Sequence, residues 1–318
     1  MQAKSEPHTA QRDKLLKILG VGFGIAVGIG GTIGVGIFRI PGSVAAQLGS
    51  AWLIILVWLI GGFYTLLGAN YQAELATMLP KAGGPYVYAR RAYGDYGGFV
   101  VGWGDWLSNV TPLAFLPIAF SEFLSTFIPS LAGNVTITAI TVLTLLAVLN
   151  WIGLRLGSGT QKLISFLKAI ALFAFVIACF VLGGQKSNSA EMTIAAPSNL
   201  SALFIAAALS FQLVLGTFGG WNAVIYFAEE DRDPSRNLPR SLFGGVLLVI
   251  VIYLLVNLAL LYVLPIAQMA GSKLPAADAM QRIFGARGGQ IVTALSLLSV
   301  LGSLNACLMF TPRTLYAL

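Results

Sequence analysis

Eight long apolar segments follow one another along this chain of 318 residues. They are Leu19–Phe38, Ala51–Thr77, Gly97–Phe120, Thr136–Ile152, Gln161–Leu182, Ser201–Phe227, Phe243–Leu264 and Ile291–Thr311. A helix that crosses a membrane needs about 20 predominantly apolar residues, and each segment is close to that length. Only 10% of the residues are charged, against about 25% in soluble domains, which is too few to cover a surface in water. We therefore expect an all-α integral membrane protein with eight transmembrane helices in a lipid bilayer.

Basic residues are unevenly divided between the connections. If all eight segments cross, the N-terminal tail, residues 1–18, shares one side with every second connection. That side holds 13 of the 19 lysines and arginines, namely Lys4, Arg12, Lys14, Lys17, Lys81, Arg90, Arg91, Arg155, Lys162, Arg232, Arg236, Arg240 and Arg313. The other side holds Arg39, Lys186, Lys273, Arg282 and Arg287. Because cytoplasmic loops are enriched in basic residues, we predict a multi-pass protein of the cell membrane with a cytoplasmic N-terminus.

The same distribution explains the net charge of +7 without a nucleic acid partner. Three of the basic residues on the outer side fall in the connection between the seventh and eighth segments, where we expect an amphipathic surface helix.

Two glycine-rich stretches lie inside apolar segments. The first segment contains GIGGTIGVGIF, Gly28–Phe38, and the sixth contains GTFGGWN, Gly216–Asn222. Glycine weakens a helix by about 1 kcal/mol relative to alanine, although a single glycine in a membrane helix often serves close packing. The two stretches are five spans apart, so their helices run in opposite directions. That pattern is expected of inverted repeats with discontinuous helices near the middle of the membrane.

The directions of the two helices indicate a ligand. The outer half of the first helix would begin at its break with unpaired N–H groups and a positive dipole end, which favour a carboxylate. The outer half of the sixth helix would end at its break with unpaired carbonyl groups, which favour an ammonium group. A carboxylate site that faces an ammonium site suits an α-amino acid.

Four stretches of this sequence resemble the amino acid–polyamine–organocation (APC) transporters. They are GTIGVGIF followed by Pro41, ELATMLPKAGGPYVYARRAYG at Glu74–Gly94, FGGWNAVIYFAEEDRDPSRNLPRSL at Phe218–Leu242, and LGSLNACLMFTPRTLYAL at Leu301–Leu318. The GGWN within the third stretch is most similar to the L-type amino acid transporter branch. The four matches occur in the order of the family and extend across the chain.

The resemblance implies a five-plus-five inverted repeat that transports amino acids by alternating access. Residues 19–184 would form the first repeat, 185–200 an extracellular loop, and 201–318 a partial second repeat. Relatives usually have twelve spans, so we expect a chain truncated after the eighth span. The implied substrate-binding residues are Ile33, Gly34, Val35 and Gly36 for the carboxylate, and Gly216, Phe218, Gly219, Gly220, Trp221 and Asn222 around the amino group.

Two positions depart from the family pattern. Val35 stands where many relatives have Ser or Thr, so the backbone must bind the carboxylate without a hydroxyl group. Gly216 stands where L-type relatives have a gating aromatic residue. Either Phe218 or another ring then closes over the substrate, or the site admits a larger side chain.

Lys168 and Asp105 are the charged residues that lie well inside predicted spans, away from the span ends. Lys168 is a functional candidate because a charge within the membrane is costly, although its long side chain could also extend to the interface. In the family, a lysine in this context stands where sodium-coupled relatives bind a cation, which implies sodium-independent exchange or proton coupling. For Asp105 we consider an ion pair or a water-filled vestibule, and also direct contact with the substrate.

We found no pattern typical of an enzyme, a metal site or a cofactor. Cys179 and Cys307 lie in apolar runs and His8 in the tail. We predict secondary active transport of neutral L-amino acids, by exchange or proton-coupled uptake. The alternatives are a cationic amino acid or polyamine as substrate, a binding protein or inactive truncated transporter that does not transport, and, more remotely, a membrane-embedded enzyme. An accessory subunit and the oligomeric state are left open.

Overall fold

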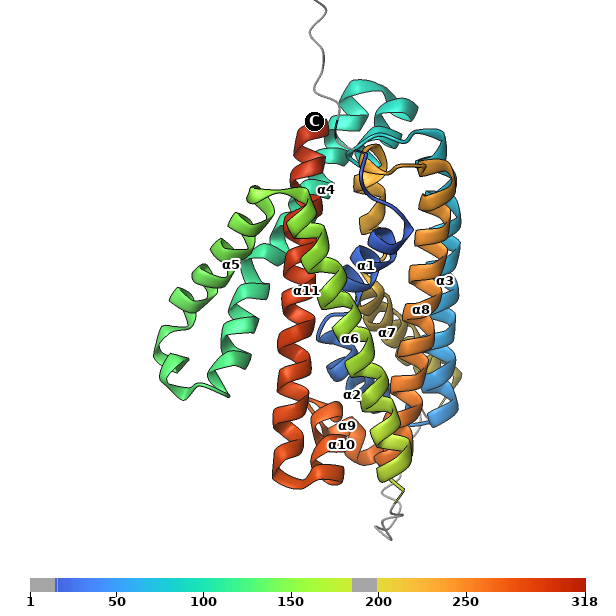
Figure 1. Ribbon diagram of the computed structural model, residues 1–318. Helices are drawn as coiled ribbons and strands as arrows, with labels where there is room; N and C mark the ends of the chain where they lie inside the picture. The colour runs from blue at the N-terminus through green and yellow to red at the C-terminus, as the bar shows by residue number, and fades with distance from the viewer. Residues whose placement is uncertain (1–14, 16, 185–198) are drawn as a thin grey trace, which may run out of the picture.

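The computed structural model describes residues 15, 17–184 and 199–318, and this part of the chain is almost entirely helical (Figure 1). Among the described residues, seven helices are long and apolar enough to cross a membrane, and a bent helix pair brings the number to as many as eight. The predicted number of eight spans agrees with the higher of these two counts. The spans are α1 (Val21–Thr32) with α2 (Gly36–Leu48), α3 (Ala51–Met78), α4 (Pro85–Ser125), α5 (Val135–Ile152), α6 (Leu154–Leu182), α7 (Leu200–Phe218) with the 3₁₀-helix η2 (Ala223–Glu230), α8 (Pro234–Val263) and α11 (Gly288–Ala317).

The predicted limits hold best for α3 and α5, which differ from the apolar segments by one residue at one end. By contrast, α4, α6, α8 and α11 extend beyond their segments because helices continue into polar sequence outside the apolar core. Within α4, Gly94 has a φ of 77° and interrupts the helix. A short 3₁₀-helix, η1 (Pro129–Asn134), links α4 to α5.

The first span ends ten residues later than its apolar segment predicts. Its second half, α2, continues to Leu48, so Arg39 lies inside a helix and not in an outer connection. The reason is that Arg39, Ser43 and Gln47 follow one another at intervals of four residues, which places them on one face of the helix. Val44 and Leu48, on the opposite face, are buried. An amphipathic helix of this kind has too low a mean hydropathy to be recognised as part of a span.

The connection between the seventh and eighth spans contains α9 (Ile266–Gly271), α10 (Pro275–Phe284) and the 3₁₀-helix η3 (Gly285–Arg287). The predicted amphipathic helix is α10. Its apolar side, which includes Ala276, Ala279 and Met280, is buried and packs against α11, α2, α6 and α8. The helix therefore covers the end of the bundle (Figure 1, bottom).

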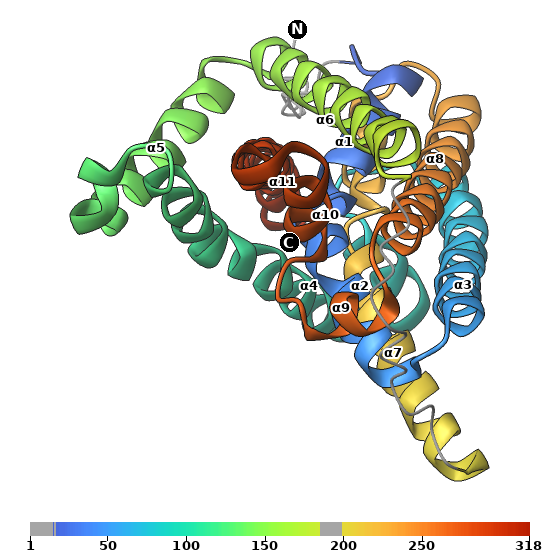
Figure 2. The same ribbon diagram turned by 90° about the horizontal axis from the view of Figure 1, so that it is seen from below.

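The centre of the bundle is α1, which packs against α6, α8 and α11 (Figure 2). Phe23 and Val27 of α1 and Leu172 of α6 belong to this core. The hairpin formed by the end of α4 and α5 leans away from the bundle (Figure 2).

Two regions singled out in the sequence lie outside the described residues. Most of the predicted tail, with Lys4, His8, Arg12 and Lys14, is one of them, and the stretch 185–198 with Lys186 is the other.

Candidate substrate site

The first span is broken between α1 and α2, which meet at an angle of 48°. Helix α1 ends at Thr32, and Ile33 leaves the helical conformation with a ψ of 90°. The N–H of Gly34 donates to the carbonyl of Thr32 at 2.9 Å, and α2 begins at Gly36. The first N–H groups of α2 have no carbonyl one turn before them. The break predicted from the glycines is present, and α2 directs its positive end toward it.

The sixth span is broken as well. Helix α7 ends at Phe218, and Gly219 and Gly220 turn the chain, Gly220 with a φ of 92°. The chain then continues as η2, which is a 3₁₀-helix. Neither span therefore has continuous α-helical hydrogen bonding.

The two broken spans run antiparallel, as their contacts show. Leu19, just before α1, forms a backbone bridge with Asp231, just after η2. At the other end, the Ser210 hydroxyl of α7 donates to Gln47 of α2 at 2.6 Å. The start of one span thus lies beside the end of the other, as predicted.

Most glycines of the first cluster serve close packing. A Cβ atom on Gly31 would lie 2.9 Å from the carbonyl oxygen of Gly220, and a Cβ atom on Gly220 would lie 2.6 Å from that of Gly31. The two backbones are therefore in direct contact. Gly28, Gly30 and Gly31 all lie within α1, before the break. Close packing explains these three glycines, and the break itself occupies 33–35.

Tyr253 of α8 joins the two breaks, and the sequence analysis did not identify it. Its hydroxyl lies 3.0 Å from the carbonyl oxygens of both Thr32 and Thr217. The side chain is fully buried. A tyrosine in the middle of the apolar run IVIYLLVN was the available signal, because a buried hydroxyl needs a hydrogen-bond partner.

Lys168 reaches the first break and does not extend to the interface. Its ammonium group donates to the carbonyl oxygens of Ile33 at 2.6 Å, Ser299 at 3.1 Å and Gly30 at 3.3 Å. Only 1% of the residue is exposed. The charge thus binds carbonyl groups of α1 and of the segment after it, and links them to α11.

Gln161 and Ser165 precede Lys168 on the same face of α6. The Ser165 hydroxyl donates to the carbonyl of Ala26 at 2.6 Å, and Gln161 accepts from Asn305 of α11 at 2.7 Å. Their spacing of four and three residues is that of one helix face. This polar stripe was a signal in the sequence that we did not use.

A groove of about 490 Å³ is lined by residues of both α2 and α7. Gly36 of the first cluster and Gly216 of the sixth line it on opposite sides, and Gln47, Gln212 and Thr217 contribute polar groups. No atom lies within 4 Å of the position that a Cβ on Gly216 would occupy. One residue from each predicted cluster therefore faces the same hollow.

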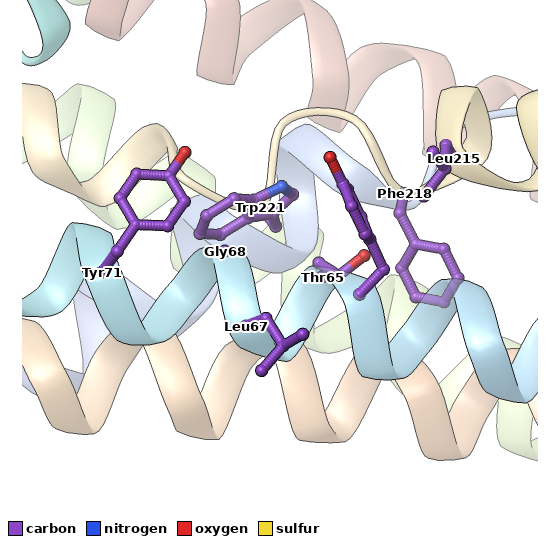
Figure 3. Close-up of a pocket in the computed structure, with 8 residues that line it drawn as sticks. Thr65, Leu67, Gly68, Tyr71, Leu215, Phe218 and Trp221 are labelled. Carbon is purple, nitrogen blue, oxygen red and sulfur yellow. The ribbon is translucent and has the colours of Figure 1, made fainter.

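A second pocket, of about 260 Å³, lies on the other side of α7, against α3 (Figure 3). The side chains of Phe218 and Trp221 line it together with Tyr64, Thr65 and Tyr71 of α3. The indole lies over Gly68, where a Cβ would be 2.9 Å from it.

Phe218 does not close over the groove between α2 and α7. Its ring packs against Tyr253 at 5.0 Å and Trp58 at 6.1 Å. Asn222 directly precedes η2 and is half-buried.

Asp105 forms neither an ion pair nor an open anionic site. None of the ion pairs between described residues includes it. Its carboxylate accepts hydrogen bonds from Tyr226 and Asn109. Its acceptor sites are thus largely occupied by neutral groups.

Comparison with known proteins then identifies the class. The family model described as "Amino acid permease" matches residues 21–318. The chain belongs to the amino acid permease family. The resemblance to APC transporters is thereby confirmed, and so is the prediction of a transport protein and not an enzyme.

Several curated relatives of this permease are amino acid transporters by name. The serine/threonine exchanger SteT of Bacillus subtilis is 29% identical over 96% of this chain and 68% of its own length. The human b(0,+)-type amino acid transporter 1 is 29% identical over 98% of this chain and 64% of its own length. The mouse Asc-type amino acid transporter 1 is 29% identical over 97% of this chain and 59% of its own length. The permease thus spans about two thirds of the length of these relatives.

Proposed function

We propose that this permease transports neutral L-amino acids by exchange, through alternating access to a site between the two broken spans. The observation that carries the proposal is the antiparallel pair of breaks, with a groove lined by Gly36 just after the first break and by Thr217 just before the second. The N-terminus of α2 would bind the substrate carboxylate through the backbone of Ile33, Gly34, Val35 and Gly36. The last carbonyl groups of α7, around Phe218 and Gly219, would bind the ammonium group.

The groove favours a substrate with an uncharged side chain. Its lining comprises Gly36, Ile40 and Gln47 of α2 and Leu209, Gln212, Leu213, Gly216 and Thr217 of α7. None of these side chains is charged, so a cationic side chain would lack a counter-charge there. Asp105, the acidic residue that kept a cationic substrate possible, is already hydrogen-bonded to Tyr226 and Asn109. The name of the relative SteT, a serine/threonine exchanger, also supports a neutral substrate and exchange.

Lys168 supports transport that does not depend on sodium. Its ammonium group occupies the space beside the carbonyl groups of Gly30, Ile33 and Ser299, where a bound cation would otherwise find oxygen ligands. A fixed charge at this place makes a sodium ion unnecessary. Proton coupling is the alternative to exchange.

The proposal includes the predicted topology. Residues 19–184 would form the first repeat and 201–318 a partial second repeat of opposite orientation, in the plasma or inner membrane. The N-terminus would be cytoplasmic. The described ends of the helices agree with this assignment, because Lys81, Arg232 and Arg313 all lie at the end of the bundle where α1 begins, as the contacts of Leu19, Glu229 and Glu230 indicate.

A counterflow experiment tests the function. The chain is reconstituted in vesicles loaded with unlabelled serine, and uptake of labelled serine is followed in sodium and in choline buffer. We expect accumulation above that of protein-free vesicles, equal in both buffers, and inhibited by neutral amino acids more than by lysine or putrescine. Binding of labelled serine without counterflow would favour a binding protein that does not transport. Absence of both would contradict the proposal.

A further inference from the structure

A polar cluster lies between η2, α4 and α11, at the end of the bundle where α1 begins. Its centre is Asp105 of α4. One carboxylate oxygen accepts from the hydroxyl of Tyr226 at 2.9 Å, and the other accepts from Asn109 at 3.2 Å and from Thr314 of α11 at 3.4 Å. Asn109 also donates to the Tyr226 oxygen at 3.1 Å. Three separate helical elements thus meet at one carboxylate.

The arginine of α11 next to this cluster is already paired with another carboxylate. On α11, Arg313 forms an ion pair with Glu230 of η2, with N–O distances of 2.6 and 2.9 Å. Its guanidinium group also lies 4.1 Å above the ring of Phe227. Asp105, which is half-buried, is therefore stabilised by its neutral donors, since a charge removed from water needs hydrogen bonds when it has no ionic partner. These donors hold it in a fixed position.

The position of Tyr226 makes this cluster a connection between parts of the fold. Tyr226 lies in the middle of η2, the segment that follows the break in the sixth span. Its ring stacks on Phe310 of α11, with centroids 5.2 Å apart. As a whole, η2 packs mainly against α1, α11, α8 and α3. The hydroxyl of Tyr226 is the group that ties η2 to α4 through Asp105.

We propose that Asp105 is a gating residue, and we refer to Asp105, Tyr226, Asn109 and Thr314 as the inner latch. The carboxylate holds η2 against α4 and α11, which keeps the path between the candidate substrate site and this end of the bundle closed. Opening toward this end requires the bonds of Tyr226 to Asp105 to break. The proposal rests on the proposed function, because a closed path has a role only in a protein that opens it.

The chain carries its own reporter of this opening. Cys307 lies on α11 four residues after Ser303, which donates to Gly30 beside the first break at 2.9 Å. It also lies three residues before Phe310, which stacks on Tyr226. These spacings place Cys307 on the same face of α11, between the candidate substrate site and the inner latch. The thiol is buried, and the proposal predicts that opening of the latch exposes it to a reagent in water.

The test measures labelling of Cys307 by a maleimide that does not cross membranes. The second cysteine is removed by Cys179→Ala, and the reagent is added in separate samples to each side of the membrane. Tyr226→Phe keeps the ring that stacks on Phe310 but removes the hydroxyl. We expect labelling from the side of the N-terminus to become about tenfold faster, because one hydrogen bond to a charged group changes an equilibrium by roughly that factor.

Two further variants complete the test. Asp105→Asn should give a similar increase, and the double variant should add little, because both changes break the same bond. Tyr316→Phe is the matched control: Tyr316 is an exposed tyrosine of α11, and its labelling rate should equal that of the parent. A sample of the protein unfolded in detergent gives the value for complete labelling of Cys307, to which the other samples are compared.

The proposal is overturned if Tyr226→Phe and Asp105→Asn label at the parent rate, or if they become faster only from the opposite side. Because labelling requires no transport, this result is independent of the counterflow experiment. Normal counterflow with unchanged labelling would reject the latch and keep the function. Faster labelling without counterflow would support the latch and reject the proposed exchange.

Discussion

Gly31 and Gly220 set the distance between the two broken spans, because their backbones are in contact. We predict that Gly220→Ala abolishes substrate binding. An added Cβ would lie 2.6 Å from the Gly31 oxygen, and the φ of 92° at Gly220 is unfavourable for alanine. Strain of this kind costs about 1–3 kcal/mol, so the thermal stability of the purified protein should fall as well.

The matched control for this change is Gly216→Ala, four residues earlier. Gly216 has open space around the position of a Cβ atom, so this variant should keep its stability. Serine binding and thermal unfolding are measured for both. Parent-like binding in Gly220→Ala would show that the close contact is dispensable.

A second prediction concerns Lys168. Lys168→Ala leaves the carbonyl group of Ile33 without its donor, whereas those of Gly30 and Ser299 keep the hydroxyl of Ser303. An unsatisfied buried polar group costs about 1–3 kcal/mol. We expect counterflow to fall at least tenfold. Lys162→Ala, at an exposed position on the same helix, should leave counterflow unchanged. Equal counterflow in the two variants would remove Lys168 from the mechanism.

The residues of the site could be predicted only in part from the sequence. The glycine clusters located both breaks within a few residues, because glycine has a recognisable effect on helices. Tyr253 could not be found in this way, since its function depends on two carbonyl groups from α1 and α7 that meet only in the fold. The direction of the Phe218 ring, toward Trp58 and Tyr253, likewise depends on packing between distant segments.

At the scale of elements, hydropathy predicted α3 and α5 well because their polar flanks coincide with their ends. It predicted α2 poorly, because the polar residues of an amphipathic helix lower its mean hydropathy although they occupy one face. The same amphipathic character places the polar side of α2 toward a groove that it shares with α7. The groove between these two half-helices is therefore a property of the pair, and no single segment predicts it.

The width of this groove should determine which substrates are accepted. Gly216→Phe would place a ring in the open space between α2 and α7. We predict that tryptophan and phenylalanine inhibit serine counterflow at least tenfold less well in this variant, whereas alanine inhibits as in the parent. Gly216→Ala serves as the control. An equal loss for small and large amino acids would indicate that the groove does not accommodate the side chain.

At the scale of the whole molecule, the number of spans and the class of the protein could be predicted from the sequence, because few charges and long apolar segments leave a chain little choice of environment. The arrangement of the bundle could not. The fixed points that hold α1 in place, namely Lys168 and Ser165 of α6, Tyr253 of α8 and Ser303 of α11, come from three helices far apart in the sequence. Together they hold the two breaks side by side, and the groove lies along the contact between α2 and α7.

In the proposed mechanism, the two half-helices bind an amino acid by its carboxylate and its ammonium group. The most direct measurement is competition with labelled serine for binding to the reconstituted chain, using L-serine, its methyl ester and N-acetyl-L-serine. We expect that blocking either end weakens binding at least tenfold, because each cap removes one charged partner. If either capped compound competes as well as L-serine does, the corresponding half-helix does not bind the substrate, and the central claim is wrong.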